Sequence, residues 1–240
     1  MNRYRASLIH LVASAFVLLL VFLLISRVWY PGVLFSKSAG VPLLKIIIAV
    51  DVIVGPFITL IIFDAKKKLI KLDMAIILLF QISFMLCGMW TVFSSRPAFI
   101  VFTGHAFYMV RANEIEHQDL SKVETKQFKH LPLFGPEFVG TNEPKDLSIR
   151  NDIAFAGLSG MGIQNLPQYY VPFSEVRNQV IAAAKNSQQW KKIDAEHKKM
   201  LEQYEKNHPG LPVGFLFLSY KTFILFVAVN TQTGDIIEII

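Results

Sequence analysis

Three long apolar runs occupy most of the N-terminal part of the sequence. Residues 8–25 and 74–93 carry no formal charge, and residues 46–63 carry one, at Asp51. A helix needs about 20 apolar residues to cross the roughly 30 Å hydrocarbon core of a bilayer. Only helices and closed barrels satisfy their backbone groups in lipid. Because the runs are continuous and do not alternate, the sequence predicts an α-helical membrane anchor of three transmembrane helices.

Composition narrows the class of protein further. Hydrophobic residues make up 53% of the chain and charged residues 18%, which excludes intrinsic disorder and lies below the roughly 25% charged residues of a soluble domain. The single cysteine, Cys87, excludes an internal disulfide framework and a zinc site built on several thiolates.

The first apolar run, residues 8–25, could also be a signal peptide. However, residues 26–31 are bulky and offer no small-residue cleavage site, which favours an uncleaved anchor.

The basic excess of the chain lies entirely in its apolar part. Residues 1–96 hold ten Lys and Arg against three Asp and Glu, whereas residues 97–240 hold 14 against 15. Because the basic residues lie beside the apolar runs, they indicate how the chain is oriented in a membrane and not that it binds phosphates. We therefore expect the lipid bilayer as a partner and expect no nucleic acid. Basic residues in short loops stay on the cytoplasmic side, and residues 66–68 are all Lys. The sequence therefore predicts a multi-pass membrane protein with a cytoplasmic N-terminus and a C-terminal domain on the far side, which in a bacterium is the periplasm.

Residues 97–240, which follow the three apolar runs, are numerous enough to form a domain of their own. We expect a membrane domain over residues 1–96 and a periplasmic α+β domain over residues 97–240. Segments 98–102 and 106–110 are rich in aromatic and β-branched residues and flank Thr-Gly-His, which predicts a hairpin. Segment 213–229 is apolar enough for a fourth span, but the central Lys221 and the high Phe, Val and Ile content favour buried strands. Segment 232–239 predicts a closing hairpin.

The middle of this domain gives weaker signals. Ten Pro and Gly between residues 131 and 173 predict a long irregular section. Ser174 is the expected cap of the helix that follows. A second helix, ending near residues 207–210, is predicted by the spacing of Trp190, Ile193, His197, Leu201 and Tyr204.

Asp51 is the one acidic residue within an apolar run, and Gly55-Pro56 follows one turn later. Proline removes a backbone hydrogen bond and favours a kink. An acid inside a membrane usually faces a partner or water. Two interpretations remain open. Asp51 could dock a cationic or polar group on the transmembrane helix of a partner, or its side chain could bond internally to His10, Thr59, Gln81 or Ser83.

Catalytic chemistry has no support in the sequence. Intramembrane aspartyl proteolysis needs two carboxylates sharing a proton, but Asp64 and Asp73 lie at the edges of the runs. The six His show no metal-binding spacing, and the glycine-rich segment 157–162 lacks the Gly-Lys-Ser/Thr ending of a phosphate-binding loop. We therefore expect no enzymatic activity, no catalytic residue, no metal and no cofactor.

Several blocks of the sequence occur in a recognisable order. They are Arg3-Tyr4-Arg5-Ala6, the Trp-Tyr-Pro-Gly block at residues 29–32, the block of residues 50–56 ending in Gly-Pro, and the Lys cluster at residues 66–68. This arrangement resembles the type IV pilin accessory proteins of the TfpX/TfpZ family, also called fimbrial assembly accessory proteins. The resemblance covers about residues 1–112 and is diffuse beyond them.

The resemblance implies an inner-membrane accessory protein that assists assembly or stability of a cognate type IV major pilin, chaperone-like and non-catalytic. The partner would be that pilin. An alternative of a different class is a membrane-anchored periplasmic sensor or ligand-binding module, which predicts a well-formed pocket in residues 97–240. A transporter is disfavoured because the three runs show no inverted repeat. The expected partner-binding residues are Asp51, Gly55, Pro56, Trp29, Tyr30, Pro31 and Gly32.

Overall fold

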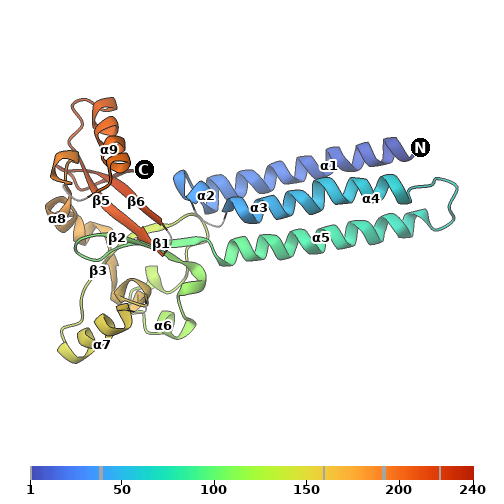
Figure 1. Ribbon diagram of the computed structural model, residues 1–240. Helices are drawn as coiled ribbons and strands as arrows, with labels where there is room; N and C mark the ends of the chain where they lie inside the picture. Colours follow the sequence, from blue (N-terminus) through green and yellow to red (C-terminus); the bar gives the residue numbers. More distant parts are fainter. Residues whose placement is uncertain (1, 38–39, 159, 191–192, 222) are drawn as a thin grey trace. The chain divides into compact units, whose positions relative to one another are not determined.

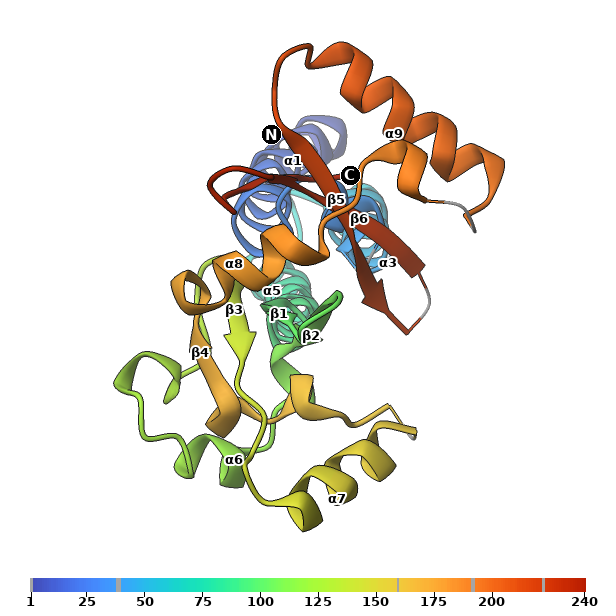
Figure 2. The same ribbon diagram turned by 90° about the vertical axis from the view of Figure 1, so that its left-hand side faces the viewer.

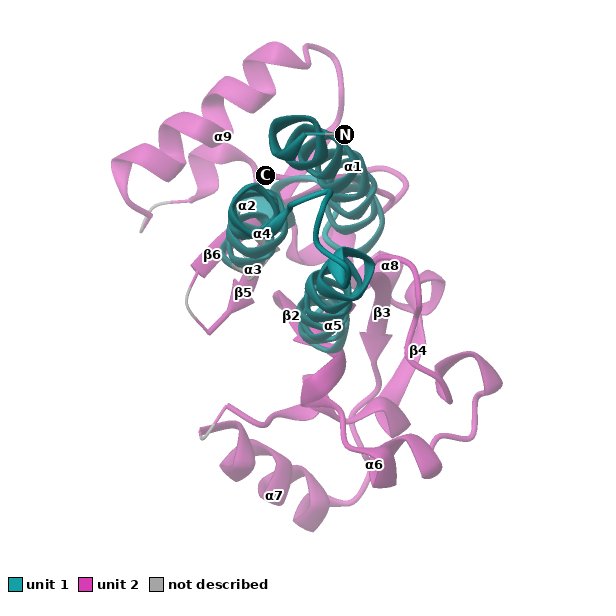
Figure 3. Cartoon of the chain, turned by 90° about the vertical axis from the view of Figure 1, so that its right-hand side faces the viewer, with its two compact units in different colours: residues 1–96 teal, residues 97–240 magenta. Residues whose placement is uncertain are grey.

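The computed structural model describes residues 2–37, 40–158, 160–190, 193–221 and 223–240. The chain divides into two compact units, residues 1–96 and residues 97–240, which Figure 3 shows in different colours. We refer to them as the helical unit and the α+β unit. The helical unit contains three helices long and apolar enough to cross a membrane, and the α+β unit contains a mixed sheet with helices. The predicted fold class is therefore confirmed.

The three spanning helices of the helical unit are Arg3–Trp29, Leu44–Ile62 and Ile70–Ser94. At 1.5 Å per residue, the shortest of them, with 19 residues, is roughly 28 Å long, close to the thickness of the hydrocarbon core. Most of their apolar side chains are exposed, as expected for lipid contact. The helical elements of this unit are α1 (Arg3–Leu23), η1 (Leu24–Trp29), α2 (Val33–Lys37), α3 (Gly40–Ile48), η2 (Ala49–Val54), α4 (Gly55–Ile62) and α5 (Ile70–Ser94), and the short α2 lies between the first two spans (Figure 1).

Two spanning helices change from α- to π-helical geometry. The first does so at η1, where the N–H of Tyr30 donates to the carbonyl of Ile25, 2.8 Å away and five residues earlier. The second does so at η2, immediately before Gly55-Pro56. Single π-helical turns often mark functional positions. The irregularity that Pro56 was predicted to cause therefore takes the form of a π-helical turn.

A small apolar core joins the spanning helices around one aromatic residue. Tyr30 is fully buried, and its hydroxyl donates to the carbonyl of Val92 at 3.0 Å and lies 3.2 Å from Ser95 Oγ. Trp29 packs against Phe93, with ring centroids 5.2 Å apart. These contacts tie the end of the first spanning helix to the end of the third.

The α+β unit contains a seven-stranded mixed sheet of order β4-β3-β1-β2-β5-β6-β7. Pairs β1–β3 and β2–β5 are parallel, and the other neighbours are antiparallel. The predicted hairpins are confirmed, and segment 213–229 forms strands and not a fourth span. The strands are β1 (Pro97–Phe102), β2 (Phe107–Arg111), β3 (Glu137–Thr141), β4 (Tyr170–Pro172), β5 (Val213–Tyr220), β6 (Phe223–Asn230) and β7 (Ile236–Ile239).

Both faces of the sheet are covered. On one face, Phe99 of β1 packs with Phe128 and Tyr170. On the other, α8 (Phe173–Ala183) contacts β3 and β4 (Figure 2). A Cβ at Gly140 of β3 would lie only 2.3 Å from Val176 Cγ1, so glycine is needed where α8 meets the sheet. Leu201 of α9 (Ala195–Asn207) packs with residues of β5 and β6.

The section predicted to be irregular contains β3, α7 (Leu147–Leu158) and β4, so that prediction was wrong. Several of its prolines lie next to helices or strands. Pro136 precedes β3, and Pro144 precedes α7. Proline and glycine therefore separate short elements here. The short helix α6 (His117–Ser121) lies between β2 and β3.

The predicted starts of two helices also need correction. The residue that precedes α8 is Pro172, and Ser174 is already the second residue of the helix, without a capping bond. The second helix begins at Ala195 and not near Trp190, because the side chain of Asp194 accepts a hydrogen bond from the N–H of His197 and caps it. Trp190 nevertheless packs on the core, 4.3 Å from the ring of Phe217. The predicted end near residues 207–210 is confirmed.

Candidate functional site in the helical unit

Asp51 lies in η2, close to the middle of the second spanning helix, and its exposed fraction is only 8%. A charged residue at the centre of a span costs about 2.5–3.5 kcal/mol on insertion scales. Such a residue persists where it has a structural or functional use. The surroundings of Asp51 are therefore the natural place to look for a site.

Pro56 explains the hydrogen bonding around the backbone of Asp51. In the π-helical turn the N–H of Gly55 donates to the carbonyl of Val50. The next donor in this register would be the N–H of residue 56, bonding to the carbonyl of Asp51, but proline has no N–H. The side chain of Gln81 in α5 supplies the missing donor, with its Nε2 3.2 Å from the Asp51 carbonyl oxygen. The third spanning helix thus completes the backbone bonding of the second.

Gly55 makes this contact sterically possible. A Cβ at position 55 would lie 1.9 Å from Gln81 Nε2 and 2.6 Å from its Cδ. Contacts this short do not occur between non-bonded atoms, so any side chain at position 55 would displace the amide. Gly55 and Pro56 therefore act together, because Pro56 leaves the Asp51 carbonyl unpaired and Gly55 leaves room for the Gln81 amide that pairs it.

The first spanning helix is fastened to the second by two polar contacts. Ser7 Oγ donates to the carbonyl of Pro56 at 2.9 Å, and His10 Nδ1 lies 2.7 Å from Thr59 Oγ1. Interhelical bonds of this kind stabilise membrane bundles where no hydrophobic effect acts between helices.

The carboxylate of Asp51 is not engaged by these contacts. Within the described part of the chain, neither of its oxygens has a hydrogen-bond partner. Of the four internal partners expected, Gln81 bonds to the backbone of Asp51, and His10 and Thr59 bond to each other. Ser83 Oγ donates to the carbonyl of Leu79. The expected bond from one of these side chains to the Asp51 carboxylate is therefore wrong.

A pocket of about 140 Å³ opens at the carboxylate. Asp51 and Gln81 line it together with His10 and Ser14 of α1, and the rest of the lining is apolar. The Oε1 atom of Gln81 is also buried without a partner among the described residues. The amide orientation follows from the contact to Asp51, because only the NH₂ group can donate to that carbonyl. The pocket therefore combines three unpaired acceptor oxygens with an apolar wall.

The other predicted partner-binding residues lie at the far end of the first spanning helix. Trp29 and Tyr30 were expected to bind a partner, but both are buried in the apolar core of the helical unit. Pro31 is half-buried, and Gly32 is exposed with a φ of 61°, a left-handed conformation that favours glycine. The structure thus separates this group from the Asp51 site and gives its aromatic members a packing role.

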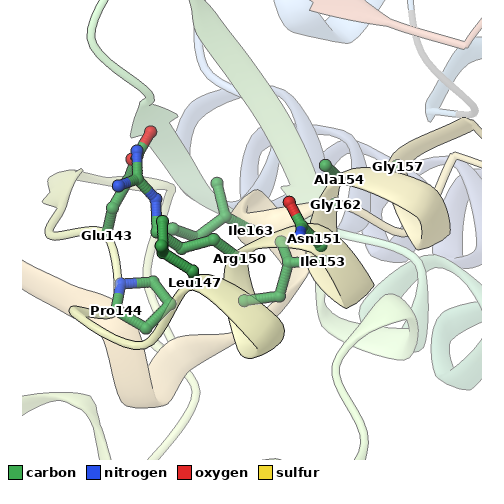
Figure 4. Close-up of a pocket in the computed structure, with 10 residues that line it drawn as sticks. All are labelled: Glu143, Pro144, Leu147, Arg150, Asn151, Ile153, Ala154, Gly157, Gly162 and Ile163. Atoms are coloured by element: carbon green, nitrogen blue, oxygen red, sulfur yellow. The ribbon is translucent and has the colours of Figure 1, made fainter.

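The α+β unit has a pocket of about 460 Å³ beside α7 (Figure 4). This volume lies within the range of small-molecule sites. Its charged residues, Glu143 and Arg150, pair with each other at 2.5 Å and have side chains that are 62% and 46% exposed. In the residues that the structure covers, no cluster of three or more His, Cys, Asp or Glu could hold a metal. The pocket therefore offers less directed chemistry than the Asp51 site.

A second polar cluster surrounds Glu114 in the α+β unit. Its carboxylate accepts hydrogen bonds from Lys221 Nζ at 2.7 Å, from the Tyr220 hydroxyl at 3.0 Å and from the N–H of Arg111 at 2.9 Å. Burial by itself would raise the pKa of Glu114. The hydrogen bonds from Lys221, Arg111 and Tyr220 outweigh that effect and hold the pKa below its ordinary value. This cluster ties β2 to the hairpin of β5 and β6.

Fold and site together define the class: a membrane protein with three spanning helices and an α+β domain, whose most distinctive site is an intramembrane carboxylate. Comparison with known proteins narrows it. A fimbrial assembly protein of serogroup I from Dichelobacter nodosus is 26% identical over 215 residues, covering 88% of this chain and 83% of the relative. The protein of serogroup E1 is 26% identical over 195 residues, covering 80% and 76%. That of serogroups C1 and C2 is 32% identical over 100 residues, covering 41% and 76%.

The chain belongs to the family of these fimbrial assembly proteins. No protein-family model matches it, and no solved structure does. The resemblance seen in the sequence is thereby supported at the level of fimbrial assembly.

Proposed function

We propose that this protein is an inner-membrane accessory protein that assists assembly or stability of a cognate type IV major pilin, without catalysing a reaction. Similarity to the fimbrial assembly proteins supports a role in pilus assembly. The observation that carries the site is the carboxylate of Asp51, which is buried between spanning helices without a partner among the described residues. A buried acid of this kind calls for a polar group from another molecule.

The distribution of surfaces matches that of a pilin subunit awaiting assembly, which keeps an apolar helix in the membrane and a globular head outside. The helical unit would receive the pilin helix and the α+β unit would face the head. Docking would occur beside Asp51, where the pocket lies between side chains of α1 and α5. Close helix packing and interhelical hydrogen bonds drive such association in lipid.

The remaining predicted residues have supporting roles in this proposal. Gly55 and Pro56 shape η2 and hold Gln81 beside Asp51. Trp29 and Tyr30 hold the end of the first spanning helix in place, which leaves Gly32 and part of Pro31 for direct contact. The Lys residues at positions 66–68 orient the helices, with the N-terminus cytoplasmic and residues 97–240 periplasmic.

The proposal is tested in a strain that lacks the chain and is complemented with variants. We expect the natural chain to restore surface pili and Asp51→Leu to fail, because leucine removes both acceptor oxygens. Asp51→Asn should restore pili in part, since its amide keeps one acceptor but no charge. Leu79→Ala is the matched control, because Leu79 is 64% exposed on the same unit. Full restoration by both Asp51 variants would contradict the docking role.

One observation favours the alternative of a periplasmic sensor or ligand-binding module, namely the 460 Å³ pocket beside α7. A metabolite screen on the purified full chain would separate the two functions. Two results together would support the module over the pilin accessory. A metabolite would raise the melting temperature of the purified chain, and Arg150→Ala would abolish that rise. Cells that lack the chain would still be piliated.

A further inference from the structure

The Asp51 pocket is rich in unpaired hydrogen-bond acceptors among the described residues. Among the described residues, the two carboxylate oxygens of Asp51 and the amide oxygen of Gln81 have no hydrogen-bond partner. The exposed fraction of each residue is 8%. Of the polar groups nearby, Gln81 Nε2 bonds to the Asp51 carbonyl and His10 Nδ1 contacts Thr59, while Ser14 also lines the pocket. The three buried acceptor oxygens therefore call for an occupant that donates hydrogen bonds.

Three kinds of occupant can be compared with this set of acceptors. An anion would be repelled by the carboxylate. A hard metal cation takes six or more oxygen ligands, more than the three available, and the described residues hold no metal-binding cluster. An ammonium group has three donors and no acceptor, which matches the three oxygens in number and in charge.

The chain itself cannot supply this group from its membrane segments. Residues 6–26, 46–63 and 72–95 contain no Lys or Arg. The nearest basic residue of the second spanning helix, Lys45, precedes Asp51 by six residues, which is almost two helical turns, and it is exposed. The donor must come from another membrane-embedded segment. The volume of about 140 Å³ is several times the roughly 30 Å³ that one water occupies, which is room for such a group and part of its stem.

We propose that the Asp51–Gln81 pocket binds a protonated amino group, a Lys side chain or a chain N-terminus, carried by an apolar membrane segment of a partner. This inference deepens the proposed docking function and rests on it for the identity of the partner alone. The pairing places the ammonium between α1 and α5. It neutralises the charge of Asp51 in the bilayer only when the partner is bound, so docking is specific for a partner with the amine at the right depth.

The experiment uses the full chain in its native membrane. A photocrosslinking residue is placed at Ala13 or at Leu78, which line the pocket, and at Ile61 as control, which is 61% exposed and does not line it. We expect both pocket positions, but not the control, to label one apolar segment that bears an amine within one helical turn. Asp51→Leu should lower the yield at least tenfold.

The amine is then tested directly. Replacing a Lys in the labelled segment by Met, or acetylating its N-terminus if that is the source, should lower the yield to the level of Asp51→Leu. For a Lys, the reversed pair, Asp51→Lys with the partner's Lys changed to Glu, should restore it. A segment without an amine, adducts to lipid or to a second copy of this chain only, or unchanged yield after removal of the charge would each overturn the proposal. A sodium-specific rise in melting temperature lost in Asp51→Asn would overturn it as well.

These outcomes separate the two proposals. A labelled pilin segment without an amine would leave the pilin function standing and remove the ammonium site. An amine-bearing segment of a protein other than pilin would establish the site and remove pilin as the partner.

Discussion

The substitution Gly55→Ala tests the coupling between the second and third spanning helices. An alanine Cβ would lie 1.9 Å from Gln81 Nε2, so the amide must move by more than about 1 Å, and its 3.2 Å bond to the Asp51 carbonyl is lost. Overpacking costs about 1–3 kcal/mol, and an interhelical hydrogen bond in a membrane contributes about 0.6–1.7 kcal/mol. Replacing glycine in a helix returns about 1 kcal/mol. We therefore expect a net destabilisation of about 0.6–3.7 kcal/mol.

The Gln81→Ala background provides the decisive comparison. There the amide is already absent, so Gly55→Ala meets no obstruction and should be neutral or stabilising by up to about 1 kcal/mol. The double-mutant cycle should then yield a coupling energy of roughly 2 kcal/mol. Reversible unfolding of the full chain in mixed micelles, followed by tryptophan fluorescence, measures each free energy. A coupling energy below about 0.5 kcal/mol would refute the contact, because independent sites add to within that margin.

Three further expectations concern the α+β unit and its placement. Glu114 has a lowered pKa in the folded chain, so its contribution to stability is present above its unfolded pKa of about 4.3 and is lost as the pH falls below it. Glu114→Gln should therefore flatten the acid side of a stability–pH curve measured by urea unfolding, and an unchanged slope would contradict this. Gly140→Ala should destabilise by about 1–3 kcal/mol through its clash with Val176, and an equal loss in a Val176→Ala background would contradict the clash. Alkaline phosphatase fused after Ile240 should be active and a cytoplasmic fluorescent reporter there should be dark, whereas the reverse would contradict the proposed orientation.

The elements with local signals were predictable from the sequence. Continuous apolar runs defined the three spanning helices, and the β-branched and aromatic content of segment 213–229 outweighed its length as evidence of strands. Ser174 was misassigned as a cap because α8 already begins at Phe173, after Pro172. Trp190 was misassigned to the second helix because Asp194 caps that helix at Ala195. The parallel pairing of β1 with β3 joins segments far apart in the sequence, and no local pattern reports it.

The candidate site was only half predictable. Asp51, Gly55 and Pro56 were identified because an acid and a proline are unusual in an apolar run. Gln81 was named as one of four internal partners of the side chain, but its contact to the backbone depends on how the second and third helices face each other. One signal could have indicated it: a proline in a π-helical register leaves a carbonyl unpaired, and a buried amide on a neighbouring helix can pair it.

Capture of pilin by the full chain tests most directly whether it is a pilin partner. An affinity-tagged chain is purified from membranes of piliated cells in mild detergent, and the co-purified major pilin is quantified for the natural sequence, for Asp51→Leu and for the control Leu79→Ala. We expect pilin with the natural chain and with the control, and at least a tenfold loss with Asp51→Leu. Absence of pilin from the natural chain, or equal amounts with Asp51→Leu, would contradict docking at the buried carboxylate.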